Sequence, residues 1–402
     1  MMSTSAHREP LWTRGFLLAC SGNALVFFTV HLFLSTVAAY SIQRFAVGDA
    51  QGGAASGLFI IGALIARLFA GPAMSRFSML GLALGMFALF AVFPILYRMT
   101  GTFEVLLVER FTHGVVFGIG SSVTASLALH RVPAMRMAEG TSWFASSTVI
   151  GVAAGPLVGL PLFRTFGFEA VSWAAVMVAV LGSVVIALLK LDGSPIAAQP
   201  AAPSDDSPKG NWISRFVEPA AIPISIIGAA WTLGYATIVT YLNGLANERD
   251  LGTGVSWFFL VYAVVTIASR QFTGRLMDRK GFNIVLIPAF VVFAAGLFTL
   301  SMAQNVATVL IAAALVGLGQ GNLLSAGQTL AIKQAERHRI GFAVSTFFLG
   351  IDAGMGTGPV IAGAIVAATS PSATFGIVSL FVLALTAVYV AVFARKRQSA
   401  RG

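Results

Sequence analysis

Charged side chains are scarce in this sequence. They make up 10% of the 402 residues, whereas an ordinary soluble domain carries about 25%. Hydrophobic residues make up 57%, which is more than one core beneath an aqueous surface can bury. Lipid must therefore surround most of the chain, and we expect an integral membrane protein.

Cysteine and histidine are also scarce. Cys20 is the single cysteine and the histidines number five, which excludes a disulfide framework and a spaced cluster of metal ligands. The sequence contains no nucleophile motif of an enzyme, so we predict no catalysis, no metal and no cofactor. The formal charge of +10 comes from scattered basic residues, so no nucleic-acid partner is expected.

The hydrophobic residues lie in long unbroken runs, such as 82–96 and 171–189. These runs exclude a membrane barrel, whose strands of about 10 residues alternate in polarity. A membrane-spanning helix needs about 20 mostly apolar residues. The runs predict an all-α polytopic protein with twelve helices, at 15–40, 53–71, 79–97, 103–128, 140–163, 168–190, 219–243, 254–273, 282–302, 306–332, 340–367 and 373–394.

A segment rich in Pro, Ala, Ser and Asp separates the sixth helix from the seventh and has the composition of an extended linker. It divides the chain into an N-terminal tail, a six-helix bundle, a linker, a second six-helix bundle and a C-terminal tail, at 1–14, 15–190, 191–218, 219–394 and 395–402. Most of the 25 Lys and Arg residues lie on the side of the termini and the linker. By the positive-inside rule, this side is expected to be cytoplasmic.

The two bundles carry an internal repeat. The segment ARLFAGPAMSR of the first aligns with SRQFTGRLMDR of the second, which pairs Arg67 with Arg270 and Gly71 with Gly274. The same separation continues through the fourth and fifth helices of each bundle. Two such halves in parallel duplication enclose a site at the bilayer midplane, and rocking one against the other exposes it alternately. This is the architecture of a carrier.

The loop from Gly274 to Gly281 resembles the signature loop of the major facilitator superfamily. Gly274 allows two helices to approach closely, and Asp278 can meet a helix N-terminus or an arginine, so the loop can latch the helix ends in one state. Ser75 stands at the acidic position of the first half, so we expect an asymmetric latch. The alternative is a positive anchor with a tight turn. The predicted gate residues are Gly71, Arg76, Gly274, Asp278 and Arg279.

The fifth helix carries small residues and a proline that resemble the motif of the superfamily's exporters. Glycines four residues apart open a groove for a neighbouring helix, and proline weakens the helix locally. The alternative is generic packing of small residues. The motif and its repeat comprise Gly151, Gly155, Pro156, Gly159, Gly354, Gly358 and Pro359.

Polar residues inside the helices form the candidate pathway for substrate and protons. Arg110 resembles the superfamily's cavity-facing arginine of helix 4. Asp352 near the centre of helix 11 is by default functional, and a proton-coupled step requires such a carboxylate; a structural hydrogen-bond anchor is its alternative. Snorkelling is an alternative for Glu109, and it competes with ligand binding at Arg67 and Arg270. The predicted pathway comprises Arg110, Glu109, His113, Asp352, Asn23, His31, Gln320, Asn322 and Tyr235.

The resemblance covers essentially the whole chain. It implies a monomeric bacterial inner-membrane exporter with both termini cytoplasmic, which exchanges a small molecule for protons, as drug, sugar or metallophore efflux proteins do. The alternatives are proton-driven uptake, facilitated diffusion, or a receptor or scaffold without transport. Substrate charge stays open, because Arg110, Arg67 and His113 suit an anion whereas Glu109 and Asp352 suit a cation.

Overall fold

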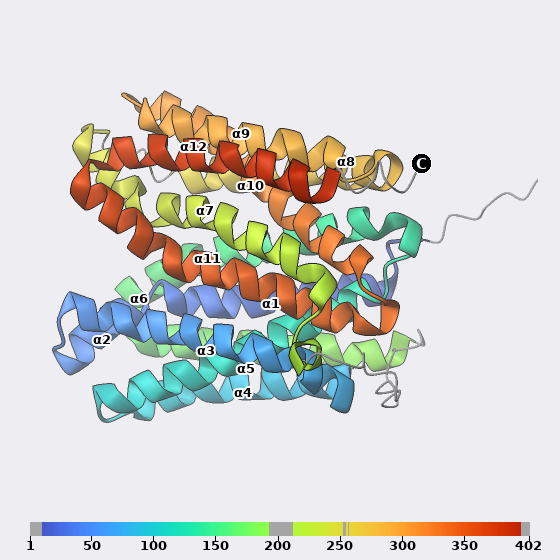
Figure 1. Ribbon diagram of the computed structural model, residues 1–402. Coiled ribbons are helices and arrows are strands. Elements are labelled where there is room, and N and C mark those ends of the chain that lie inside the picture. The colour runs from blue at the N-terminus through green and yellow to red at the C-terminus, as the bar shows by residue number, and fades with distance from the viewer. Residues whose placement is uncertain (1–9, 193–211, 252–254, 256, 395–402) are drawn as a thin grey trace, which may run out of the picture.

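The computed structural model describes residues 10–192, 212–251, 255 and 257–394. The predicted C-terminal tail, most of the N-terminal tail and most of the linker lie outside the described residues. Long helices account for nearly all of the described chain and run side by side (Figure 1). In that view α2 to α5 lie below and α9, α10 and α12 above, with α1 and α11 between them.

The long helices divide at the linker into two sets. The first set is α1 Arg14–Leu34, α2 Val37–Phe45, α3 Asp49–Arg76, α4 Met79–Met99, α5 Phe103–Leu129 and α6 Met137–Ala187. The second set is α7 Ile222–Glu248, α8 Trp257–Lys280, α9 Asn283–Ser301, α10 Val306–Gln334, α11 Ile340–Ala368 and α12 Pro371–Tyr389. Short 3-10 segments precede α6, α7 and α11, at Ala134–Arg136, Pro219–Ala221 and Arg337–Arg339.

Twelve membrane spans arise from these elements within the described ranges. Eleven segments are long and apolar enough to cross a bilayer; α1 with α2 forms one of them and α6 supplies two. These two spans are Ala134–Gly159 and Pro161–Lys190. Inside the second, the helix is kinked at Gly167, whose φ of 75° lies in the left-handed region that glycine tolerates. The twelfth span is α8, which is less apolar because charged residues occupy its end. Its 24 residues have a length of about 36 Å, enough for a bilayer core.

The first span breaks between α1 and α2. The side chains of Ser35 and Thr36 donate hydrogen bonds to the Leu32 carbonyl oxygen, at 3.0 and 2.9 Å. Such local bonds compete with the backbone ladder of a helix. The sequence predicted one continuous helix over 15–40, and these two hydroxyl groups explain the interruption.

Two helices are longer than predicted, and the difference moves two arginines. The sequence placed the ends of the second and eighth spans at 71 and 273, but α3 continues to Arg76 and α8 to Lys280. Arg67 and Arg270 consequently lie deeper in the bundle, where they are 3% and 1% exposed. The snorkelling interpretation of these two residues is wrong, because a snorkelling side chain keeps its charged head in water.

The spans form two bundles with separate apolar cores that meet at one end. We call this end the linker end, because the chain leaves the first bundle there after Ala187 and enters the second before Ile222 (right side of Figure 1). One buried cluster contains Phe144 and Leu129 of the first bundle together with Ile340 and Val344 of the second. The halves also meet along two lines of contact, the α3/α11 seam and the α6/α8 seam.

Candidate functional site

The middle of the α3/α11 seam contains a buried ion pair. Nε of Arg67 on α3 donates to a carboxylate oxygen of Asp352 on α11. Nη1 of the same guanidinium donates to the hydroxyl groups of Ser121 and Ser122 on α5, at 3.1 and 3.2 Å. The Asp352 side chain remains 21% exposed. The pair therefore ties the two halves together while its carboxylate stays accessible.

The linker end of the α6/α8 seam is polar. Asp278 on α8 accepts from the backbone N–H groups of Ala138 and Glu139, at 3.1 and 2.9 Å, which lie in the first turn of α6. A carboxylate at a helix N-terminus satisfies donors that have no partner within the helix. Nζ of Lys333 lies 3.1 Å from the same carboxylate, and Arg275 donates to Glu139 at 2.8 Å. This end of the seam carries alternating charges from both halves.

Gly274 brings α8 close to α6 in this seam. A Cβ atom at this position would lie 2.8 Å from the Cα atom of Glu139 and 2.8 Å from Oγ of Ser142. Any larger residue would therefore push the two halves apart. The predicted gate residues Gly274 and Asp278 thus face the opposite half, one helical turn apart.

The linker end of the α3/α11 seam is apolar. A Cβ atom at Gly71 would collide with the ring of Phe342, and one at Gly341 would lie 2.8 Å from Cε of Met74. Ser75 is exposed and donates a hydrogen bond to Pro72 of its own helix at 2.8 Å. The structure therefore has no carboxylate at this position to meet the N-terminus of α11. The two other predicted gate residues, Arg76 and Arg279, are both exposed.

Arg110 and His113 lie inside the first bundle and are fully buried. Nε of Arg110 donates to the Ala55 carbonyl oxygen at 2.9 Å, Nη1 donates to the Tyr97 hydroxyl at 3.3 Å, and the guanidinium lies 4.6 Å from the Phe59 ring. The Tyr97 hydroxyl also hydrogen-bonds with Nδ1 of His113 at 2.7 Å. This network joins α3, α4 and α5 within one half and does not reach the other half.

Glu109 precedes Arg110 but occupies a different environment. It is partly buried, and its Oε2 accepts from the Thr100 hydroxyl at 2.5 Å, at the end of α4. The contact is within the first bundle. Glu109 therefore differs from Asp352, whose ion pair crosses a seam.

Asn23 and His31 make separate contacts. Nδ2 of Asn23 donates to the hydroxyl groups of Ser147 and Thr148, at 3.0 and 2.8 Å, and so links α1 to α6. Nδ1 of His31 lies 2.9 Å from the Phe27 carbonyl oxygen of its own helix. The structure therefore gives Asn23 an interhelical role in packing and leaves His31 with a local contact.

The second bundle holds a polar group of its own. The Tyr262 hydroxyl on α8 donates to Oε1 of Gln320 on α10 at 2.5 Å, and the rings of Tyr262 and Tyr235 stack with centroids 5.4 Å apart. Asn322 accepts from Thr273 at 2.6 Å. Three predicted pathway residues thus lie between α7, α8 and α10, although Tyr262 was absent from the prediction.

Arg270 lies two turns from Tyr262 on α8. Its Nε and Nη2 atoms both donate to the Gly321 carbonyl oxygen of α10, at 3.1 and 2.8 Å. Its buried Nη1 atom has no hydrogen-bond partner. Among the described residues, no carboxylate lies within ion-pair distance of this guanidinium.

The arrangement of two bundles around two seams agrees with a family comparison. A family model described as the Major Facilitator Superfamily matches residues 17–281 and 246–402. The chain belongs to this superfamily. It is therefore a multi-pass membrane transporter with a small-molecule substrate rather than an enzyme.

Relatives in the superfamily have low identity with this chain. An uncharacterized MFS-type transporter, MJ1560 of Methanocaldococcus jannaschii, is 24% identical over 275 residues, which are 67% of this chain and 70% of that protein. The multidrug resistance protein MdtG of Salmonella choleraesuis is 32% identical over 141 residues. That alignment spans 34% of each chain, so it compares about a third of MdtG with this protein.

Two solved structures share the superfamily fold. The human organic anion transporter MFSD10 (TETRAN) has a TM-score of 0.75 at 12% identity, over 93% of this chain and 98% of that one. The transporter FucP, in the outward conformation, has a TM-score of 0.69 at 13% identity, over 93% and 98%. At these identities the likeness concerns the fold alone.

The glycines predicted from the exporter motif pack two helix pairs inside the halves. Gly151 and Gly155 face Phe27 and His31 of α1, and Gly159 faces Leu32 of the same helix. In the repeat, Gly354 faces Ala229 of α7 and Gly358 faces Leu233 and Ala236. The Pro359 carbonyl oxygen accepts from Tyr241 at 3.0 Å, also on α7, while Pro156 lies within α6. These contacts hold α6 against α1 and α11 against α7 within each bundle.

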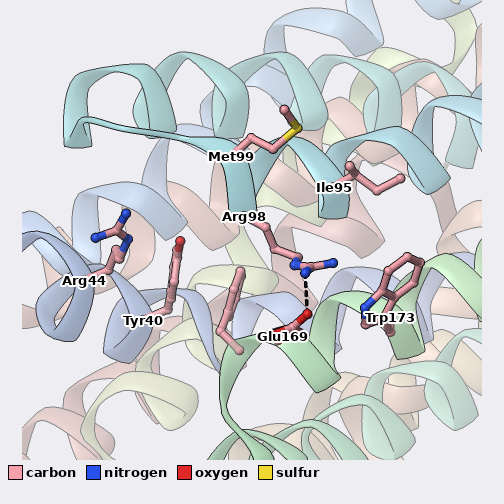
Figure 2. A pocket seen from close by; sticks show the side chains of 8 residues that line it. Tyr40, Arg44, Ile95, Arg98, Met99, Glu169 and Trp173 are labelled. Carbon is pink, nitrogen blue, oxygen red and sulfur yellow. Dashed lines mark hydrogen bonds and ion pairs between the residues drawn. The ribbon is translucent and has the colours of Figure 1, made fainter.

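A pocket of about 540 Å³ opens at the end of the first bundle opposite the linker end. Figure 2 shows Arg98 joined to Glu169 between the labelled side chains of α4 and α6. The Arg98 guanidinium lies 5.1 Å from the Trp173 ring. The pocket is lined by Tyr40, Arg44, Ile95, Arg98, Met99, Phe168, Glu169 and Trp173. None of the predicted pathway residues lines it, and it lies within one half.

Proposed function

We propose that this transporter is a proton-coupled exporter that works by alternating access. The observation that supports this best is the ion pair of Arg67 and Asp352, in which a buried guanidinium of one half holds a partly exposed carboxylate of the other. An ionisable residue inside a membrane domain is costly and is by default functional. This pair lies where relative motion of the halves would break it.

Protonation of Asp352 supplies the coupling step. A proton on the carboxylate removes its negative charge and with it the ionic attraction to Arg67, while Ser121 and Ser122 still accept from the guanidinium. The α3/α11 seam can then separate in the middle. Release of the proton restores the carboxylate and the pair. The proton thus changes the relative stability of the two arrangements of the halves.

The hydrogen bonds and ion pairs described between the halves lie at midspan and at the linker end. We infer that the linker end is cytoplasmic, since basic residues concentrate there, and that the present arrangement is closed toward the cytoplasm. Two rigid units, proposed as 15–190 and 219–394, then rock about the site. In this scheme Asp278 and Glu139 are the polar part of the cytoplasmic gate.

One comparison favours export over uptake, because part of the chain resembles a multidrug resistance protein. The membrane is proposed to be the bacterial inner membrane, where a proton gradient is available.

The experiment uses the full chain in proteoliposomes loaded with a pH-sensitive dye. Drugs, sugars and organic acids are added outside in turn, and a coupled substrate changes the internal pH. Asp352→Asn should abolish this pH change and preserve counterflow exchange of the same substrate. Thr112→Ala, an exposed hydroxyl in α5, serves as the control. A substrate-induced pH change that persists in Asp352→Asn would rule out Asp352 as the proton carrier, and everted vesicles test the direction.

A further inference from the structure

Arg270, at the middle of the α6/α8 seam, is a cation with no counter-ion among the residues that the structure describes. The repeat pairs Arg270 with Arg67, but it pairs Asp352 with Val149. Val149 packs against the apolar core of the second bundle, so it faces the half that contains Arg270. The carboxylate that balances Arg67 therefore has no equivalent opposite Arg270.

The spacing along α8 puts Arg270 on the helix face that meets α6, while its Nε and Nη2 atoms donate to the Gly321 carbonyl oxygen of α10. Gly274 and Asp278 both contact α6, and Arg270 lies one turn before Gly274 on the same face, since residues four apart share a helix face. The guanidinium is 1% exposed and its Nη1 atom is unpartnered. Burying an unpaired charge is costly, so its retention calls for a ligand.

A second unpartnered polar group lies along the same seam. Oγ of Ser142 on α6 is buried without a hydrogen-bond partner and lies next to Gly274. Ser142 and Arg270 thus offer donors from opposite halves within about one helical turn. Arg110 is also buried with one unpartnered atom, Nη2, but its guanidinium packs against the Phe59 and Tyr97 rings of its own bundle.

We propose that Arg270 and Ser142 bind the carboxylate of an aromatic monocarboxylate substrate between α6 and α8. The planar guanidinium matches a carboxylate, to which it can donate two parallel hydrogen bonds. Tyr262 and Tyr235, stacked two turns along α8, provide the surface for the aromatic ring. The substrate carboxylate would then be the counter-ion of Arg270 in the α6/α8 seam, as Asp352 is the counter-ion of Arg67 in the α3/α11 seam.

The substrate site at Arg270 rests on the proposed function, and it has one consequence for the transport cycle. A carboxylate bound at Arg270 connects the halves across the α6/α8 seam, just as ionised Asp352 connects them across α3/α11. Substrate and proton then act on different seams. Binding at Arg270 requires no proton gradient, so it can be measured apart from coupling.

The experiment measures the unfolding temperature of the purified full chain in detergent against increasing benzoate, with benzamide as the neutral isostere. Benzoate should stabilise the wild type and benzamide should not.

Arg270→Met should weaken benzoate binding about ten- to a hundredfold, the range expected for hydrogen bonds to a charged group. Arg270→Lys should be intermediate because the planar fork is lost, and Ser142→Ala should weaken binding severalfold. Arg164→Met, which removes a charge from an exposed position of α6, is the matched control and should bind as the wild type does.

A merely structural role for Arg270 gives a different result. Without ligand, Arg270→Met should raise the unfolding temperature, because it removes an unpaired buried charge; a structural arginine would lower it. Equal stabilisation by benzamide, no stabilisation by benzoate, or unchanged benzoate affinity in Arg270→Met would overturn the proposal. Benzoate binding that depends on Arg270, together with failure of the Asp352→Asn coupling test, would overturn only the proposed function.

Discussion

The two seams between the halves derive from one repeat, yet they place their charges at different depths. In the α3/α11 seam the ion pair is at midspan and the linker end is apolar. In the α6/α8 seam the linker end carries Asp278 and Glu139, whereas at midspan Arg270 donates to α10 of its own half and Val149 occupies the position that corresponds to Asp352. Duplication has thus kept the close glycine packing of both seams and divided the ionic contacts between them. In the proposed cycle, each seam therefore responds to a different ligand: the proton at α3/α11 and the substrate at α6/α8.

The largest expected effect comes from breaking the midspan pair of the α3/α11 seam. Arg67→Ala should lower the free energy of unfolding by about 3–5 kcal/mol, because Asp352 is left in the protein without its cation. The double variant Arg67→Met with Asp352→Leu should recover most of this loss. Thermal unfolding of the purified variants measures both. A double variant as unstable as the single one would mean that the pair itself, and not the unpaired charge, dominates stability.

A carboxylate introduced at position 149 would give the α6/α8 seam a midspan ion pair like that of the α3/α11 seam. Val149→Asp should supply a counter-ion to Arg270 and stabilise the chain by about 1–3 kcal/mol relative to Val149→Asn, the isosteric control. It should also suppress benzoate binding, because the new side chain occupies the same guanidinium. If Asp and Asn at this position behave alike in both measurements, then position 149 does not face Arg270.

The linker ends of the seams should respond unequally to loss of a polar side chain. Asp278 interacts with the N-terminus of α6, a contact of about 0.3–2 kcal/mol, so Asp278→Asn should favour opening of the linker end up to about thirtyfold. Ser75→Ala should change little, because the Ser75 hydroxyl contacts only its own helix. Maleimide labelling of a buried reporter, Ala128→Cys in a Cys20→Ser background, reports the opening. Similar labelling of both variants would contradict the asymmetric latch.

The smallest effect is expected from adding an acid to the apolar linker end. Ser75→Asp places a carboxylate near the N-terminus of α11, as Asp278 lies near that of α6. It should stabilise the closed state by about 0.3–1 kcal/mol and slow labelling of the same reporter about two- to fivefold. Ser75→Asn is the control, because it has the size of aspartate without its negative charge. Faster labelling in Ser75→Asp than in Ser75→Asn would show that the two loops do not bind helix ends equivalently.

Periodicity and composition predicted the class of fold and the number of spans, because lipid requires long apolar helices whatever their partners. They could not predict the depth of Arg67. Its position depends on where α3 ends, and the segment up to Arg76 is too mixed in polarity to mark that end. The repeat did predict that Ser75 and Asp278 would differ, because the register aligns the two loops directly.

Pairing between distant residues was the part that the sequence could not supply. Asp352 was identified from its isolation in an apolar helix, but nothing local to it indicates Arg67 as its partner. The repeat shows only that the carboxylate is unmatched, since Arg67 corresponds to Arg270 whereas Asp352 corresponds to Val149. Arg110 and His113 show the reverse case. Their motif suggested a cavity, yet the surrounding aromatic side chains enclose them within one bundle.

The separation of Arg67 from Asp352 has a consequence for biosynthesis. The two residues are 285 positions apart, so at a translation rate of about 5–20 residues per second the carboxylate is made roughly 15–60 s after the arginine. Ser121 and Ser122 follow Arg67 by only 54 and 55 positions. During synthesis these two hydroxyl groups are thus available to the guanidinium long before its counter-ion exists. The nascent first half can enter the membrane with its charge already hydrogen-bonded, and the second half completes the neutralisation when it is inserted.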